Sequence, residues 1–225
     1  MKKGFTLAEV LITLAIVGVV ASITLPNLTA NIRKQQVGPA LAKAINTIQL
    51  ANKLALQEND ARNLEQLCKN ANKSDYFDEV LKPYIKFTKA PVAKPYYDYM
   101  GKTTKNLGTN TFTTNDGITF LRSRTTTPVA NANVNNLDRH YSGQYYSVYV
   151  DINGNAKGPN SLAKDVFYLI VDTKGTVIPY GSGIYDDYIG NKNSSWTTNC
   201  KKKAIPTDPL SCAGSVADNG WKVIY

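Results

Sequence analysis

The sequence predicts an α+β protein in which a long N-terminal helix packs on the antiparallel β-sheet of a C-terminal head. Three features of the sequence support this fold class. A long apolar run occupies residues 5–25, apolar residues at helical spacing continue to about residue 57, and strands joined by hairpin turns begin only after residue 108. With 225 residues, the chain has room for one well-cored domain and an extra segment.

The apolar run follows Met1-Lys2-Lys3-Gly4 and contains one charged residue, Glu9. As a helix that rises about 1.5 Å per residue, it would span about 30 Å, the thickness of the hydrocarbon core of a bilayer. The run is apolar on all sides, so it requires apolar surroundings. The two lysines before it indicate that its N-terminus stays on the cytoplasmic side of a membrane.

Three simpler interpretations fit parts of this segment: a secretory signal peptide, a plain membrane anchor and the buried core helix of a soluble protein. A signal peptide has an apolar core of about 7–15 residues, which is shorter than this run. Neither a signal peptide nor an anchor accounts for Glu9, since a charge inside a bilayer costs about 2.5–3.5 kcal/mol and is usually functional. The length of the run and its basic flank argue against a core helix.

The segment Lys2-Lys3-Gly4-Phe5-Thr6-Leu7-Ala8-Glu9-Val10-Leu11 closely resembles the cleavage and methylation signal of type IV prepilins and type II secretion pseudopilins. The resemblance implies a type IV pilin-like fold, cleavage after Gly4 by a prepilin peptidase, and N-methylation of Phe5. It also implies a single-pass inner-membrane precursor that later joins a periplasmic or cell-surface filament. Cleavage leaves a cationic amine on Phe5, and we expect Glu9 of an incoming subunit to neutralise the amine of its neighbour and so set the register.

Helical periodicity resumes after Pro26, which ends the apolar run, and it predicts an amphipathic helix to about Gln57. Two separate helices remain an alternative, because a proline inside a helix removes a hydrogen bond; the family resemblance favours one long curved helix. The apolar positions of the second half are Val37, Leu41, Ile45, Ile48 and Ala55. The predicted organisation is a leader at 1–4, a transmembrane or filament-core half-helix at 5–28, an amphipathic half-helix at 29–58 and an extracytoplasmic α+β head at 59–225.

The head begins with a polar stretch, and a short helix is predicted near residues 76–82, ended by Pro83. Residues 88–110 are rich in Thr, Lys, Pro and Tyr and indicate loop or edge structure. Two hairpin turns, Asn115-Asp116-Gly117 and Thr173-Lys174-Gly175, then join strands of a sheet with four or five members. The predicted strands cover residues 109–114, 118–122, 144–151, 166–172 and 176–178.

Oxygen-bearing side chains at alternate positions, Asp151, Asn153 and Asn155, suggest a calcium loop that ends near Asp165. The loop does not match an EF-hand, because Gly154 comes too early and Lys157 lies among the candidate ligands. Asp, Asn and Gly also dominate ordinary turns, and similar stretches in related heads indicate a structural turn. We therefore predict no cofactor and treat these three residues as weak calcium candidates. The resemblance to secretion pseudopilins, some of which bind calcium in a C-terminal loop, makes Asp186, Asp187 and Asp208 equally weak candidates.

The three cysteines do not by themselves determine a pairing. Cys200 and Cys212 are close in sequence and would close a small loop in an oxidising compartment. Resemblance to the C-terminal region of pilin-like heads implies a disulfide between them. Cys68 would then stay reduced, be buried or pair with another subunit.

The sequence contains none of the common catalytic motifs, so we predict that the protein is not an enzyme. Its one histidine, His140, lies in a polar stretch without a partner pattern. The formal net charge of +9 permits anionic partners such as DNA, but the positive residues are scattered and the one run, at 201–203, is typical of a solvated loop. The leading interpretation is a structural subunit of a type IV pilus or related filament. The alternatives are a type II secretion pseudopilin and a minor pilin that binds DNA or a surface ligand.

Overall fold

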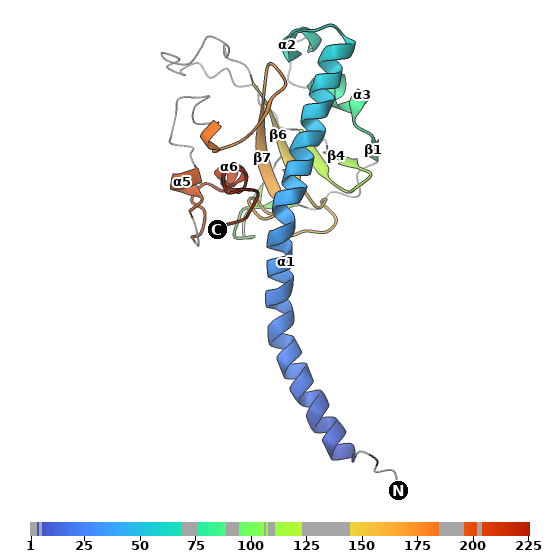
Figure 1. Cartoon of the computed structure of the whole chain (residues 1–225), viewed down its shortest axis with the longest axis vertical. Coiled ribbons are helices and arrows are strands. Elements are labelled where there is room, and N and C mark those ends of the chain that lie inside the picture. Colours follow the sequence, from blue (N-terminus) through green and yellow to red (C-terminus); the bar gives the residue numbers. More distant parts are fainter. Residues whose placement is uncertain are drawn as a thin grey trace. The chain divides into compact units, whose positions relative to one another are not determined.

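The computed structural model describes residues 4, 6–68, 76–88, 95–105, 107, 111–122, 145–184, 196–201 and 204–225. The chain divides into two compact units, Met1–Gln36 and Val37–Tyr225 (Figure 1). The helical elements are α1 (Leu7–Glu58), α2 (Leu64–Leu67), the π-helical turn η1 (Tyr76–Leu81), α3 (Lys82–Tyr84), α5 (Trp196–Asn199), the 3₁₀ turn η3 (Pro209–Ser211) and α6 (Cys212–Asp218). The strands are β1 (Phe87–Thr88), β2 (Tyr96–Tyr97), β3 (Thr104–Lys105), β4 (Thr111–Thr114), β5 (Thr119–Arg122), β6 (Tyr145–Asp151), β7 (Val166–Asp172) and β8 (Val177–Pro179).

Helix α1 continues without a break through Pro26 and Pro39, so the alternative of two separate helices is wrong. In the N-terminal unit, described side chains of α1 are exposed, with Ala21 partly covered. By length and composition alone, α1 is the one helix of the described chain that is long and apolar enough to cross a membrane.

In the C-terminal unit, α1 buries one face of its second half in the core. The five apolar residues predicted for this face are all buried, and Leu41 and Ile48 have no exposed surface. Fully burying a side chain of this size stabilises a fold by about 1.5–3 kcal/mol. The buried positions recur every three or four residues: Val37, Gly38, Leu41, Ala44, Ile45, Ile48, Ala51, Asn52 and Ala55.

A six-stranded antiparallel sheet, in the order β1-β4-β5-β6-β7-β8, forms the second layer of this unit (Figure 1). Alternate residues of its central strands face the helix and share a core with it, among them Val148 and Val150 of β6 and Phe167 and Leu169 of β7. The opposite face is also apolar, because Ile170 of β7 packs there with Ile178 of β8 and with two tyrosines. The predicted α+β arrangement is therefore confirmed.

The sheet has more strands than the four or five predicted. The additional strand, β1, lies at its edge and pairs with β4 through Phe87 and Thr88. Within the segment predicted as loop or edge, β2 and β3 form a separate two-stranded sheet. The prediction that Pro83 ends the helix near 76–82 is also wrong: Pro83 lies in the first turn of α3, where its missing N–H costs little, and the helical turn continues to Tyr84.

Both predicted hairpins form at their turn residues. Between β4 and β5, Gly117 takes the positive φ of 88° that glycine tolerates, and its N–H donates to the Thr114 carbonyl at 2.9 Å. Between β7 and β8, Gly175 has φ of 86° and donates to the Asp172 carbonyl at 3.0 Å. The register of both strand pairs follows from these local turns.

Candidate functional site

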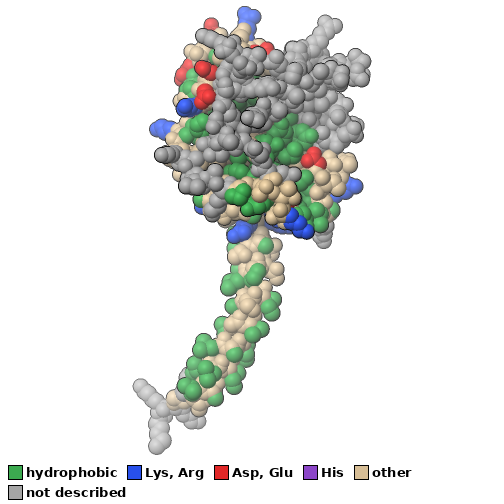
Figure 2. Space-filling view, turned by 180° about the vertical axis from the view of Figure 1, so that it is seen from behind, with side chains coloured by type: hydrophobic (Ala, Val, Ile, Leu, Met, Phe, Trp, Pro, Cys, Tyr) green, Lys and Arg blue, Asp and Glu red, His purple; other side chains and the backbone are tan. Residues whose placement is uncertain are grey.

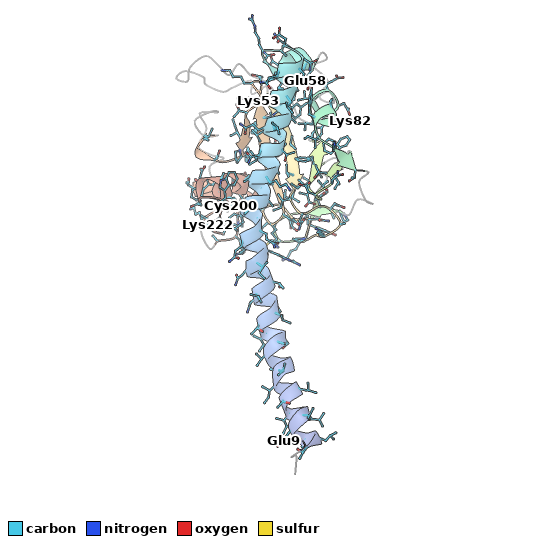
Figure 3. All side chains as sticks on the ribbon, turned by 45° about the vertical axis from the view of Figure 1, so that its right-hand side comes forward. Glu9, Lys53, Glu58, Lys82, Cys200 and Lys222 are labelled. Atoms are coloured by element: carbon cyan, nitrogen blue, oxygen red, sulfur yellow. A yellow bond between two sulfur atoms is a disulfide. The ribbon has the colours of Figure 1, made fainter. Side chains whose placement is uncertain are left out.

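Thr6 and Glu9 form a capping box at the start of α1. Glu9 is labelled there in Figure 3. The Thr6 backbone N–H and the Thr6 hydroxyl each donate to Glu9 Oε2 at 2.8 Å. In return, the Glu9 backbone N–H donates to Thr6 Oγ1 at 3.3 Å. These contacts satisfy backbone groups that an isolated helix start leaves unpaired. The carboxylate of Glu9 is thus held at the N-terminal end of the helix.

Gly4, the residue before the predicted cleavage point, is exposed, and the structure has nothing within 4 Å of the place where a side chain at Gly4 would begin. Phe5, the predicted methylation site, lies outside the described residues. The position of Gly4 itself is therefore open.

The helix that follows presents a continuous apolar surface. Leu7 is 81% exposed, and no charged residue occurs between Glu9 and Arg33. Figure 2 shows hydrophobic side chains along the visible face of this segment. An exposed apolar surface of this extent requires lipid or protein neighbours. Its large side chains are Leu7, Val10, Leu11, Ile12, Leu14, Ile16, Val17, Val19, Val20, Ile23, Leu25, Leu28 and Ile32.

A buried polar contact joins α1 to the C-terminal sheet. Asn52 has no exposed surface; its Nδ2 donates to the Gly175 carbonyl at 2.8 Å, and its Oδ1 accepts from the Tyr76 hydroxyl at 2.7 Å. Nearer the surface, Lys43 Nζ lies 2.5 Å from Asp116 Oδ2 in the β4–β5 turn. A hydrogen bond from Lys43 lowers the pKa of Asp116. Together these contacts hold the second half of α1 on two hairpins.

The calcium candidates Asp151, Asn153 and Asn155 lie where β6 ends and the β6–β7 loop begins; this name denotes residues 151–165, with Asp151 the last residue of β6. Asp151 and Asp165 are both buried. Asp151 Oδ1 accepts from the Gly154 backbone N–H at 2.9 Å, and Oδ2 accepts from the Tyr96 hydroxyl at 3.2 Å. Burial, together with the nearby Asp165 carboxyl group, raises the pKa of Asp151 to about 7. Burial also raises the pKa of Asp165. The loop therefore brings two carboxyl groups into one weakly solvated environment.

Asn153 and Asn155 belong to the same loop, whereas Asp208 lies elsewhere. Asp208 caps η3 by accepting from the Leu210 backbone N–H at 3.1 Å, and Asp186 and Asp187 lie outside the described residues. Sequence reasoning missed Tyr96, which reaches the loop from β2. Sequence reasoning also gave no role to Asn160. Its place directly after Gly158 and Pro159 was the one feature of the sequence that could have drawn attention to it.

The C-terminal region is closed by the disulfide between Cys200 and Cys212, with Cα atoms 5.4 Å apart. Cys68 is half-buried and is not part of this disulfide. Asp218 of α6 accepts from the Trp196 indole N–H at 2.8 Å and from the Gly183 backbone N–H at 2.7 Å. These contacts indicate that Trp196 has a structural role. His140, the one histidine, lies outside the described residues.

Among known protein families, the prokaryotic N-terminal methylation motif matches residues 1–25 of the chain. The match includes Gly4, Phe5, Glu9 and the exposed apolar start of α1. Neither a curated protein nor a solved structure matches the chain. The group of proteins with this motif consists of structural subunits. The chain therefore carries the hallmark of prepilin-type proteins, the group that comprises the type IV pilins and the pseudopilins.

Proposed function

We propose that this protein is a structural subunit of a type IV pilus or a related filament. It is inserted in the inner membrane as a prepilin, cleaved after Gly4 by a prepilin peptidase and methylated on Phe5. It then polymerises through the first part of α1. The observation that carries the proposal is the methylation motif at residues 1–25, joined to the exposed apolar surface of the first part of α1, from Leu7 to Ile32.

The apolar surface of α1 supports both stages of this pathway. In the membrane, acyl chains surround the large apolar side chains between Leu7 and Ile32, and in the filament the same side chains pack against neighbouring helices. The transfer exchanges one apolar environment for another, so the surface never has to face water. The C-terminal unit, with its own core, remains outside the membrane.

Glu9 supplies the charged contact of the proposed filament. Cleavage after Gly4 creates an α-amine on Phe5, which is protonated in water below a pKa of about 8. Inside an apolar filament core, this cation needs a counter-ion, and the Glu9 carboxylate of a neighbouring subunit is in the right part of the helix. A buried ion pair at one position also penalises shifted registers, in which both charges would lose their partners.

The intact mass of the native protein tests the proposal. The protein is recovered separately from sheared surface material and from membranes, and each fraction is measured by mass spectrometry. Loss of residues 1–4 with one added methyl group, found in the sheared fraction, supports a surface filament subunit. An unprocessed chain in both fractions contradicts the proposal, because a plain membrane anchor would then account for the helix.

Two further experiments separate the related roles: secretion assays in a deletion strain, and assays of DNA binding at different salt concentrations. The same processed mass found only in membranes would favour a type II secretion pseudopilin, and a deletion strain would then lose secretion of folded substrates. A minor pilin that binds DNA would bind it in a salt-dependent way, since contacts to phosphates release counterions. Loss of surface filaments with normal secretion in the deletion strain supports the pilus subunit.

A further inference from the structure

The β6–β7 loop contains two buried amide oxygens without hydrogen-bond partners, which its role as a turn does not explain. Asn160 is 2% exposed, and its Nδ2 donates to the Asn155 carbonyl at 2.9 Å, yet its Oδ1 has no partner. Asn153 Nδ2 donates to the Gly158 carbonyl at 3.1 Å, and its Oδ1 is likewise buried and without a partner. Each side chain thus spans part of the loop through its Nδ2 and leaves a buried acceptor without a partner.

Two carboxyl groups contact the same two residues through other atoms. The Asn160 backbone N–H donates to Asp165 Oδ2 at 2.8 Å, and the Asn153 side chain lies near enough to lower the pKa of Asp165. Asp151 accepts from the Asn153 backbone N–H at 3.3 Å. The loop therefore gathers four oxygen-bearing side chains, two of them acidic, within a short piece of chain.

The described lysines do not supply a counter-ion for this pair of carboxyl groups. Lys157 is exposed, and Lys164 Nζ lies over the Tyr99 ring, 5.1 Å from its centroid. Between described residues, salt bridges join Lys43 to Asp116 and Lys82 to Asp78, and neither involves the loop. A buried pair of carboxylates is unfavourable unless a cation lies beside it, and the described part of the chain shows none there.

From this arrangement we propose that the β6–β7 loop binds a calcium ion through side-chain oxygens of Asp151, Asn153, Asn160 and Asp165. The hydrogen bonds that the carboxylates already accept do not prevent this, because each carboxylate offers about four lone-pair sites. An ion in the loop interior would give both amide oxygens a partner and balance the acidic pair.

The donor set favours calcium over other common metals. Calcium takes six to eight oxygen ligands from carboxylates, amides and backbone carbonyls, and it tolerates irregular geometry. Zinc prefers Cys and His, and the described residues contain no group of three or more Cys, His, Asp or Glu side chains that could hold a metal. Magnesium demands near-ideal octahedral geometry. With two carboxylates, the site belongs to the weaker, extracellular class, with a Kd of about 0.1–1 mM.

Terbium luminescence tests the proposal directly, because Tb³⁺ replaces calcium and accepts excitation energy from nearby tyrosines. The Tyr96 hydroxyl lies 3.2 Å from Asp151 Oδ2, so Tyr96 is placed to sensitise the ion. The full chain in detergent is titrated with TbCl₃ under tyrosine excitation, and CaCl₂ or MgCl₂ is then added. We expect saturable emission that calcium removes and magnesium removes poorly. Emission that is not saturable, or that calcium does not displace, would overturn the proposal.

Two variants locate the ion. Asp165→Asn removes one charge from the loop, whereas Asp172→Asn removes a buried carboxylate at the other end of β7 and serves as the matched control. We expect Asp165→Asn to weaken terbium and calcium binding about tenfold or more, a typical effect of disturbing a metal site, and Asp172→Asn to leave it unchanged. Equal affinity in wild type and Asp165→Asn would assign the emission to another site and refute the proposal.

Thermal unfolding of the wild-type chain decides the question if Asp165→Asn does not fold. An ion that binds the folded state alone raises the unfolding midpoint as its concentration exceeds the Kd. We expect a higher midpoint in millimolar CaCl₂ than in EGTA, with no such rise in MgCl₂. Identical midpoints in CaCl₂ and EGTA would contradict a calcium site.

Discussion

Asn52 of α1 and Gly175 of the β7–β8 turn are joined by a buried hydrogen bond of 2.8 Å, from the Asn52 amide to the Gly175 carbonyl. Gly175 permits this approach because a side chain there would begin 2.9 Å from Asn52 Cβ. The same asparagine accepts from the Tyr76 hydroxyl, so one residue joins the helix, the sheet and the π-helical turn. The contact depends on a carbonyl, a hydroxyl and an amide that are all removed from water.

We predict that Asn52→Ala lowers the free energy of unfolding by about 3 kcal/mol, because it leaves buried polar groups unpaired. Gln57→Ala, a change at an exposed position of the same helix, is the control and should have little effect. Urea unfolding of the full chain in detergent measures both variants. In a double-mutant cycle with Tyr76→Phe, additive losses would contradict a coupled contact.

Gly38 provides a second test of how α1 packs in the C-terminal unit. A Cβ atom at this position would lie 1.7 Å from the Trp221 carbonyl oxygen, so Gly38→Ala must displace the C-terminal segment. Overpacking of this kind costs about 1–3 kcal/mol or more, and we expect a lower unfolding midpoint. Gly18→Ala is the matched control, because nothing lies within 4 Å of its Cβ position. Equal unfolding midpoints for the two variants would contradict the prediction, because the C-terminal segment would then move aside without a loss of stability.

Glu9 is the residue on which the proposed assembly depends. We predict that Glu9→Gln, which keeps the shape of the side chain and removes its charge, leaves membrane insertion intact and strongly reduces filaments. Thr13→Val is the control: Thr13 donates only to the Val10 carbonyl of its own helix, so its loss should be tolerated. Immunoblots of membrane and sheared fractions measure both effects. Normal filaments from Glu9→Gln would refute the assigned role.

Because of its buried carboxyl group, Asp172 should make the free energy of unfolding depend on pH. Its carboxyl group has no exposed surface, and burial raises its pKa in the folded state. The folded state then binds the proton more tightly than the unfolded state, so this contribution to stability is present below about pH 4 and is lost as the pH rises through the folded-state pKa. We predict that the free energy of unfolding of Asp172→Asn falls less than that of the wild type over this pH range. The difference is about 1.4 kcal/mol for each unit by which the folded-state pKa of Asp172 exceeds its unfolded-state pKa. Urea unfolding from pH 4 to 8 in EGTA measures the slopes, and parallel curves for the two proteins would contradict the prediction.

Features that depend on neighbouring residues could be predicted from the sequence. The Gly117 and Gly175 turns, strand β7 and the buried face of α1 all follow from local spacing and turn chemistry. Glu9 could be singled out because it is the one charged residue in the apolar run of residues 5–25.

Features that depend on distant pairing could not be predicted in the same way. Strand β1 has two residues, Phe87 and Thr88, and exists only because β4 pairs with it. Asn52 occupies a position that helical spacing alone would give to an apolar side chain. In the β6–β7 loop, the spacing of Asp151, Asn153 and Asn155 was visible, but the unpaired oxygen of Asn160 is a property of the folded loop.

The capping box at the start of α1 has a consequence for how subunits would join and leave the proposed filament. Glu9 Oε2 already accepts two hydrogen bonds from Thr6 within its own chain. A carboxylate that turns to a neighbour's amine exchanges these bonds for new ones, so the net gain from the contact is small, and the old bonds can re-form when the neighbour departs. Growth would then be driven by burial of the apolar helix surface. The charged contact would set the register of the subunits, and it could form and break with little change in free energy.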